Sequence, residues 1–220
     1  MTFHAAIGRH GAGERLARHR HAQGYVAVVL DGGYLEAGES GRIRARAGMA
    51  VVHHAWSAHQ DGFGATGAQV LNLPLPAGLA EGPVRITDPD AVARLAERDP
   101  LAAAELVRET AAALAAPPSD WPDLLAAALA ADPSLPIRDW AHATSLDPAS
   151  VSRGFARAYG VSPKRFRLEL RTRRAVRALT GWRGTLAALA AEHGFADQAH
   201  FARAAGALTG LPPSRLRLLR

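Results

Sequence analysis

The sequence predicts an α+β protein with more than one domain, in which an N-terminal β-barrel and Ala-rich helices precede an all-α C-terminal domain. Three observations predict this class. Short strand-like segments with many glycines occupy residues 3 to about 76, helical periodicity begins at Asp88, and the balance of charge changes sign near residue 131. A chain of 220 residues is long enough for one large or two small domains.

The predicted barrel or sandwich rests on short segments separated by Gly-containing turns. The segments are Tyr25–Leu30, Gly33–Ala37, Arg42–Ala45, Ala50–Val52 and Ala68–Leu73. We expect a turn at Asp31-Gly32-Gly33. We also expect the prolines Pro74, Pro76 and Pro83 to close the β-region.

Two short helices are predicted next. Asp88 is a suitable N-cap and Pro89 a suitable first residue for a helix that runs to Glu97. A second helix covers Pro100–Ala115 and ends before Pro117-Pro118. Both are too short to be stable alone, so they pack either on the barrel or on a second copy of the chain as a homodimer interface. The sequence leaves both alternatives open.

Composition separates the chain into two parts. Residues 1–131 carry 11 Arg and 14 acidic residues, whereas residues 132–220 carry 15 basic and 6 acidic residues. A basic half attached to a mildly acidic half indicates a polyanion-binding module. The chain has no cysteine, which excludes disulfide scaffolds, thiolate zinc sites and cysteine nucleophiles. Without an apolar run of about 20 residues or a signal-peptide pattern, we expect a cytoplasmic protein associated with the nucleoid, without a membrane partner.

The basic half contains an internal repeat. Asp147, Val151, Arg153, Gly160, Val161 and Pro163 recur, 50 residues later, as Asp197, Phe201, Arg203, Gly210, Leu211 and Pro213. A third helix, Leu124–Ala131, precedes the first copy. Each copy then predicts a leading helix, a turn and a second helix: Ile137–Ala143 and Pro148–Tyr159 in the first, Thr185–Glu192 and Asp197–Thr209 in the second. Two helices joined by a short turn form a helix-turn-helix unit, whose second helix enters the major groove of DNA.

A basic helix, Pro163–Thr180, links the two copies. Its apolar side carries Leu168, Ala175, Val176 and Leu179, and seven basic residues stand against the single acid Glu169. A solvated helix face explains such a run in many proteins. Between two helix-turn-helix units, contact with DNA phosphates is the preferred interpretation.

Residues 120–220 resemble the DNA-binding domain of the AraC/XylS family of transcriptional regulators. The resemblance rests on the segments SLDPASVSRGF (145–155), YGVSPKRF (159–166) and GFADQAHFAR (194–203). It implies base contacts from Ala149, Ser152, Arg153, Gln198, Ala199 and Arg203. The partner that it implies is double-stranded operator DNA. From the charge of the linking helix we expect phosphate contacts by Lys164, Arg165, Arg171 and Arg174, while His200 is either a further phosphate contact or a plain surface histidine.

The second copy departs from the family pattern. Ala205 replaces an expected aromatic residue, and Gly206 stands inside the helix, where glycine costs about 1 kcal/mol relative to alanine. Ala149 and Ala199 offer only methyl contacts to bases. We therefore expect the first unit and the linking helix to contribute more of the affinity than the second unit.

Residues 15–73 resemble the cupin-type barrel that AraC-family proteins use as a regulatory domain. The resemblance rests on His19-Arg20-His21 and on the segment RAGMAVVHHAWSAH (46–59). It implies that His19, His21 and His59 occupy metal-ligand positions, although no Glu stands at the fourth. A divalent metal bound by these three imidazoles is one interpretation, and no cofactor is assigned beyond it. The other is an organic effector pocket, with Tyr25 and Trp56 as its walls.

The sequence thus predicts a regulatory domain at 1–116, with the barrel at about 3–76 and helices at about 88–115, and a DNA-binding domain at 120–220. The predicted function is that of a non-enzymatic, sequence-specific transcriptional regulator, controlled by a small-molecule or metal effector and, as an activator, in contact with RNA polymerase. The alternative is a cupin metalloenzyme, an oxygenase or isomerase, with a DNA-binding tail. A DNA-repair methyl acceptor is excluded because it needs a thiolate. Arg153, Gln198 and Arg203 speak against a DNA binder without sequence specificity.

Overall fold

The computed structural model describes residues 6–114 and 120–218. The chain divides into two compact units, Met1–Asp123 and Leu124–Arg220, and each is described by itself. The predicted break at Pro117-Pro118, the predicted boundary at residue 116, and residues 3–5 of the predicted barrel lie outside the described residues.

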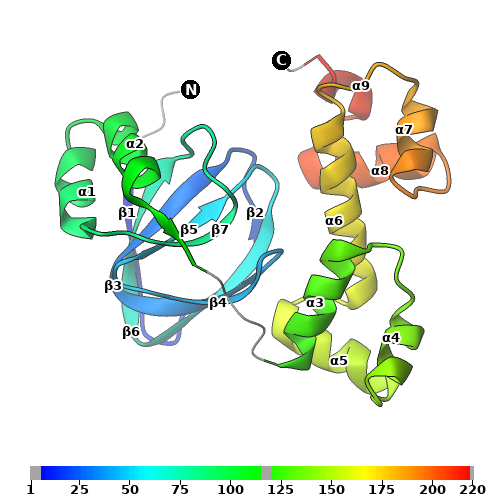
Figure 1. The fold of residues 1–220 in the computed structure, drawn as a ribbon, viewed down its shortest axis with the longest axis horizontal. Coiled ribbons are helices and arrows are strands. Elements are labelled where there is room, and N and C mark those ends of the chain that lie inside the picture. The colour runs from blue at the N-terminus through cyan, green and yellow to red at the C-terminus, as the bar shows by residue number, and fades with distance from the viewer. Residues whose placement is uncertain (1–5, 115–119, 219–220) are drawn as a thin grey trace. The chain divides into compact units, whose positions relative to one another are not determined.

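The N-terminal unit is built on an antiparallel sheet that curves round on itself as a barrel (Figure 1). Its eight described strands are β1 (Ala6–His10), β2 (Arg15–Arg20), β3 (Tyr25–Gly38), β4 (Gly41–Arg46), β5 (Met49–His53), β6 (Ala58–Pro74), β7 (Gly82–Arg85) and β8 (Ala112–Ala113). The long strands β3 and β6 pair along most of their length. The first half of β3 also pairs with β5 and its second half with β4, while β6 pairs with β2 at its start and with β1 at its end. The two long strands therefore connect the opposite walls of the barrel.

The prediction of a turn at Asp31-Gly32-Gly33 is wrong, because β3 continues through these residues. The register of β3 against β6 shifts on both sides of Gly32, whose φ is +67°. A Cβ on Gly32 would lie 2.1 Å from the carbonyl oxygen of Gly67, and a Cβ on Gly67 would lie 2.2 Å from that of His10. These glycines therefore let two strands bend and pass close together instead of ending them.

The helices α1 (Pro89–Ala96) and α2 (Pro100–Thr110) cover one outer face of the sheet. The side chain of Asp88 caps α1 as expected, and Asp99 caps α2. Val92, Ala103 and Val107 are buried in one cluster with Val26 and Val28 of β3. Of the two alternatives for these helices, the structure shows packing on the barrel.

Two boundaries differ from the prediction in this region. The helix predicted to reach Ala115 ends at Thr110, because Ala112–Ala113 pairs with Val84–Arg85 as an edge strand. Pro83 does not close the β-region either, since it lies within β7. At Pro83 this strand is in register with Val51 of β5 alone, because its pairing with Ala112–Ala113 covers only Val84 and Arg85. A proline, which has no N–H to donate, is tolerated where a second ladder is absent.

The C-terminal compact unit is all-α and contains the two predicted helix-turn-helix units, which are joined by a linking helix (Figure 1). Its described helices are α3 (Trp121–Ala131), α4 (Ile137–Ala143), α5 (Pro148–Tyr159), α6 (Pro163–Ala178), α7 (Leu186–Glu192), α8 (Gln198–Thr209) and α9 (Pro213–Leu216). Helix α3 begins three residues before its predicted start, and α6 ends two residues before its predicted end. Gly160 and Gly210, with φ of +72° and +76°, end α5 and α8 in the left-handed conformation that glycine adopts without strain.

No helix within residues 6–114 and 120–218 combines the length and the hydropathy that crossing a bilayer requires.

Candidate nucleic-acid interface and barrel histidine cluster

The starts of α5 and α8 carry the residues that the sequence predicts to meet DNA bases. Asp147 accepts a hydrogen bond from the backbone N–H of Ser150 at 2.8 Å, and Asp197 accepts one from that of His200 at 2.6 Å. Each carboxylate caps the first turn of its helix. The side chains predicted to contact bases are all exposed: Ala149, Ser152, Arg153, Gln198, Ala199 and Arg203. Both helix starts are therefore open to solvent.

The opposite faces of α5 and α8 are buried, but their cores differ in size. Val151, Phe155 and Phe201 are fully buried. In the first helix-turn-helix unit, Phe155 stacks on Tyr159 with ring centroids 4.5 Å apart, and the ring of Phe166 meets both rings edge-on at 5.3 Å. Each such aromatic pair contributes about 0.5–1.5 kcal/mol beyond its burial.

The second helix-turn-helix unit has no counterpart of these three aromatic residues. Fifty residues after Phe155, Tyr159 and Phe166 stand Ala205, Thr209 and Leu216. Among the described residues, the second helix-turn-helix unit has instead a tilted pair of rings, Phe195 and Phe201, with centroids 5.2 Å apart, and the His200 ring meets Phe195 edge-on at 5.2 Å. α8 of the second helix-turn-helix unit therefore buries fewer aromatic side chains than α5 of the first.

Two of the arginines that the sequence assigns to phosphate contact also bind the protein backbone. Arg171 Nη1 donates a hydrogen bond to the carbonyl oxygen of Gly194 at 2.6 Å, and Arg174 Nη2 donates one to the carbonyl oxygen of Ala130. Both bonds lie within the C-terminal compact unit, Leu124–Arg220. The sequence pattern of α6 marks the charge of these residues but cannot show that they hold neighbouring helices in place.

A basic hollow of about 250 Å³ lies beside the N-terminal half of α6. Its lining is Ser162, Lys164, Arg165, Arg167, Leu168, Arg171 and His200. Four of the five residues predicted to contact phosphate are in this set. The structure therefore brings together Lys164, Arg165, Arg171 and His200, while Arg174 is engaged with α3. Cationic side chains around a concave surface concentrate positive potential there.

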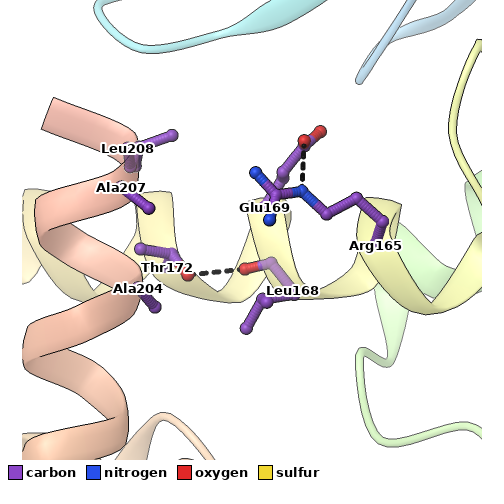
Figure 2. A pocket seen from close by; sticks show the side chains of 7 residues that line it. All are labelled: Arg165, Leu168, Glu169, Thr172, Ala204, Ala207 and Leu208. Atoms are coloured by element: carbon purple, nitrogen blue, oxygen red, sulfur yellow. Dashed lines mark hydrogen bonds and ion pairs between the residues drawn. The ribbon is translucent and has the colours of Figure 1, made fainter.

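A second, much smaller hollow lies between α6 and α8 (Figure 2). Its volume is about 20 Å³, close to that of one water molecule. On α6, Arg165 Nε pairs with the buried carboxylate of Glu169 at 3.0 Å. On α8 the facing side chains are small, Ala204 and Ala207, and they leave the space between the helices unfilled.

The barrel gathers a second group of polar residues, which we call the barrel cluster: Tyr25, Glu36, His53, His59 and Asp61, with His19 and His21 beside them. Cross-strand pairing explains it. His19 lies opposite His59, Tyr25 opposite His53, and Glu36 opposite Asp61. Residues directly opposite on antiparallel strands point to the same face, which here is the inside of the barrel.

The predicted metal-binding histidines lie together in this cluster. Ligand nitrogens of His19, His21 and His59 are all within 4.8 Å of one another. The His19 and His59 ring centroids are 4.3 Å apart, and those of His53 and His59 are 4.4 Å apart. Metal binding by His19, His21 and His59 stays a prediction.

Burial is the main cause of the pKa shifts in the barrel cluster. It raises the pKa of Glu36 well above its usual value, with Asp61 as a further cause, and it raises the pKa of Asp61 to about 7. It lowers the pKa of His59, and the neighbouring His53 lowers it further. His59 is therefore a neutral imidazole at pH 7, the form that ligates metals.

Tyr25 and Trp56, the predicted effector-pocket walls, occupy different surroundings. The Tyr25 hydroxyl lies 3.3 Å from His59 Nε2, and the Tyr25 ring stacks on His53. Trp56 is half-buried in the β5–β6 turn with φ of +65°, and its backbone N–H donates to the carbonyl oxygen of His21 at 2.8 Å. An effector pocket formed by the two residues stays a prediction.

The sequence analysis missed Glu36 and Asp61 and assigned no role to His53. One signal was available. Glu36 stands two residues after Tyr34, and Asp61 two residues after His59, so each shares a strand face with an inward residue. Pairing of the strands was needed to see that these faces meet.

Comparison with known proteins gives one family match. A family model described as a helix-turn-helix domain matches residues 140–218. No curated protein sequence matches this chain.

Solved structures with a similar arrangement include three bacterial proteins. ToxT from Vibrio cholerae is 7% identical, with 99% of this chain and 98% of that chain covered and a TM-score of 0.45. The C-terminal domain of AraT, a response regulator from Geobacillus stearothermophilus, is 19% identical over 45% of this chain and 81% of that chain, with a TM-score of 0.39. A transcriptional regulator with an AraC-type DNA-binding domain, from Chromobacterium violaceum, is 22% identical over 43% and 86%, with a TM-score of 0.40.

The family match begins within α4 and extends past α9, so it includes both recognition helices, α5 and α8, and the linking helix. Residues 140–218 of this chain are therefore a helix-turn-helix DNA-binding domain of the AraC type.

Proposed function

We propose that this chain is a sequence-specific transcriptional regulator whose C-terminal unit reads an operator and whose barrel receives a small effector. The observation that carries the proposal is the pairing of two capped recognition helices on one linking helix, each with exposed polar side chains at its start. Two such helices suit successive major grooves, which are about 34 Å or about 10 base pairs apart.

In this proposal Arg153 and Arg203 read bases through their guanidinium groups and Gln198 through its amide. Arginine binds the O6 and N7 acceptors of guanine with two hydrogen bonds, and glutamine pairs in the same way with adenine. Ser152 adds a hydroxyl, while Ala149 and Ala199 offer methyl contacts to thymine. Arg153 is exposed and its Nη2 lies 3.2 Å from Ser150 Oγ, a weak local contact that a base edge can replace.

Phosphate contacts are assigned to the basic hollow. Lys164 and Arg165 follow the N-terminus of α6, and His200 and Arg171 complete the rim. The positive end of the α6 dipole adds to the attraction for an anionic oxygen. Arg174 stays in the proposal as a contact made by its remaining donors.

The effector, the homodimer and RNA polymerase complete the proposal. The barrel cluster is where we place the effector, since it holds polar groups inside an apolar wall. A homodimer through the helical layer of α1 and α2 belongs to the proposal as the sequence predicts it. RNA polymerase is the further partner of an activator.

The experiment is a selection of bound fragments from a random DNA library at near-physiological salt, using the full chain. We expect an enriched motif with two short elements about 10 base pairs apart. The Arg153→Ala variant should lose preference within one element only. Binding without enrichment, falling with salt alone, would leave only phosphate contact and overturn the proposal.

A Lys164→Ala variant separates phosphate from base contact. Losing one phosphate contact weakens binding to every sequence alike and lowers the slope of log affinity against log salt by about 1. Lysine 164 has a matched control in Arg177, which is exposed at the far end of the same helix. Arg177 does not line the basic hollow, so Arg177→Ala should lower the salt slope by less than Lys164→Ala does.

A further inference from the structure

The most buried part of the barrel cluster is a group of two imidazoles and one carboxylate. Glu36 on β3, His53 on β5 and His59 on β6 are 3%, 4% and 2% exposed. Their ligand atoms all lie within 4.8 Å of one another, and His53 Nε2 is 3.4 Å from Glu36 Oε2. Ligands bound tetrahedrally at 2.0–2.1 Å are separated by about 3.4 Å, so this pair already has the required spacing.

Two atoms of this group are buried without a hydrogen-bond partner among the described residues. They are Glu36 Oε2 and His59 Nδ1. Buried polar atoms are satisfied in almost all folded proteins, so each such atom calls for an explanation. A proton shared between Glu36 and His53 would satisfy the carboxylate but would leave His59 Nδ1 as it is. A cation bound through Glu36 Oε2 and His59 Nδ1 would satisfy both atoms.

The chemistry of the donors points to a particular class of cation. Imidazole nitrogens bind first-row transition metals and zinc, whereas Ca²⁺ and Mg²⁺ prefer oxygen ligands. Two histidines with one carboxylate are a known ligand set for zinc, with a further position for water. The carboxylate supplies negative charge that offsets part of the charge of a dication in a buried site.

The surroundings provide a route from the surface to this group. His21 is exposed and His19 is half-buried, and their rings lie 5.8 Å and 4.3 Å from that of His59. His59 thus belongs both to the outer group with His19 and His21 and to the inner group with His53 and Glu36. An ion can pass from the outer group to the inner one by exchanging ligands at His59.

We propose that Glu36, His53 and His59 form a binding site for a divalent transition-metal ion of the Zn²⁺ type inside the barrel. The outer pair, His19 and His21, captures the ion at the surface and is not part of the final site. The site deepens the proposed function, because it names the chemical class of the effector. Its test reads metal binding alone, and so it succeeds or fails independently of DNA binding.

The experiment is a Zn²⁺ titration of the chelator-treated full chain, followed by calorimetry. We expect about one Zn²⁺ per chain, and loss of at least about 100-fold in affinity in Glu36→Gln and in His53→Gln. The matched control is His54→Gln, which removes the next histidine along the chain, one bound instead to the carbonyl oxygen of Leu79. We expect the control to bind as the wild type does. His21→Gln should slow binding and leave the affinity within about 10-fold of the wild-type value.

X-ray absorption at the zinc edge of the wild-type protein is a second measurement that does not depend on the folding of the variants. Two imidazoles and oxygen ligands in the first shell support the site. Three imidazole ligands in the X-ray absorption spectrum would place the ion in the outer group and overturn the proposal. The same conclusion would follow if His21→Gln lost affinity for Zn²⁺ while Glu36→Gln kept it. Absence of Zn²⁺ binding by the wild type would overturn it as well.

Discussion

Arg171 donates a hydrogen bond from Nη1 to the carbonyl oxygen of Gly194 at 2.6 Å, and so joins the linking helix to the turn between α7 and α8. Its guanidinium carbon also lies 4.9 Å from the centre of the Phe195 ring. A cation over an aromatic face and a charged donor on a backbone carbonyl are both stabilising contacts. The second helix-turn-helix unit is thus held to α6 by an arginine that also lines the basic hollow.

The Arg171→Ala variant should loosen the second unit selectively. A hydrogen bond from a charged donor contributes about 1.5–3 kcal/mol. Backbone amides of α7 and α8 should therefore exchange hydrogen for deuterium at least about 10-fold faster, while those of α4 and α5 keep their rates. Arg177→Ala, on the same helix, is the control. Equal acceleration in both units would show that Arg171 acts on the whole domain.

The two base-reading arginines should differ in effect. Arg153 lies on the helix backed by Phe155, Tyr159 and Phe166, whereas Arg203 lies on the helix that buries Ala205 instead. A firmly packed helix loses less conformational entropy when it binds DNA, so a contact made from it retains more of its binding free energy. We expect Arg153→Ala to weaken operator binding by about 1–3 kcal/mol and Arg203→Ala by less. Fluorescence anisotropy with the selected operator measures both, and the reverse order would contradict the expectation.

The N-cap of α5 should make the first unit sensitive to acid. The backbone hydrogen bond from Ser150 lowers the pKa of Asp147 below its ordinary value of 3.8. A lowered pKa in the folded state means that the stabilisation is complete above pH 3.8 and is lost as the pH falls through the folded-state value.

Asp147→Ala should therefore have a lower Tm than the wild type at neutral pH, and the gap should close in acid. Asp147→Asn is the matched control, since its amide oxygen caps the helix without titrating. Thermal unfolding followed by circular dichroism, at a series of pH values, measures the three proteins. A gap that stays constant into acid would mean that the carboxylate charge has no part in the cap.

Gly67 should be one of the least replaceable glycines of the barrel. Its φ is +68° and a Cβ there would lie 2.2 Å from the carbonyl oxygen of His10. Gly13 has a φ of +72° and open space at its Cβ position. Both positions impose the same backbone cost of about 1–2 kcal/mol on alanine, so the difference between Gly67→Ala and Gly13→Ala isolates the collision.

We expect Gly67→Ala to destabilise the protein by at least about 2 kcal/mol more than Gly13→Ala does. Urea unfolding of the full chain measures this as a shift in midpoint. Equal midpoints for the two variants would show that β1 moves aside freely.

The helical elements were predictable because their signals are local. Asp88 caps the helix that the sequence assigns to it, Asp147 and Asp197 cap α5 and α8, and Gly160 and Gly210 end these two helices. A cap, a left-handed glycine and a 3.6-residue period each act over a few residues, so they can be read without knowledge of the rest of the chain. The DNA-binding domain was recognisable for the same reason.

The sequence predicts that a barrel forms, but not where its strands bend or where the neighbouring helix ends. Gly32 and Gly67 give the same local signal as turn glycines, and only the crossing of β3, β6 and β1 shows that they serve a bend. The end of α2 was likewise decided by the pairing of Ala112–Ala113 with β7.

By itself, the sequence determined a basic C-terminal domain with paired recognition helices and a histidine-rich barrel. Only the tertiary structure decided that Glu36, His53 and His59 meet inside that barrel, and that Arg171 and Arg174 bind backbone carbonyls. The register that places Tyr25 opposite His53 and Glu36 opposite Asp61 depends on the packing of the whole sheet. A shift of one residue would turn these side chains to the other face, so their meeting depends on long-range contacts that no local pattern records.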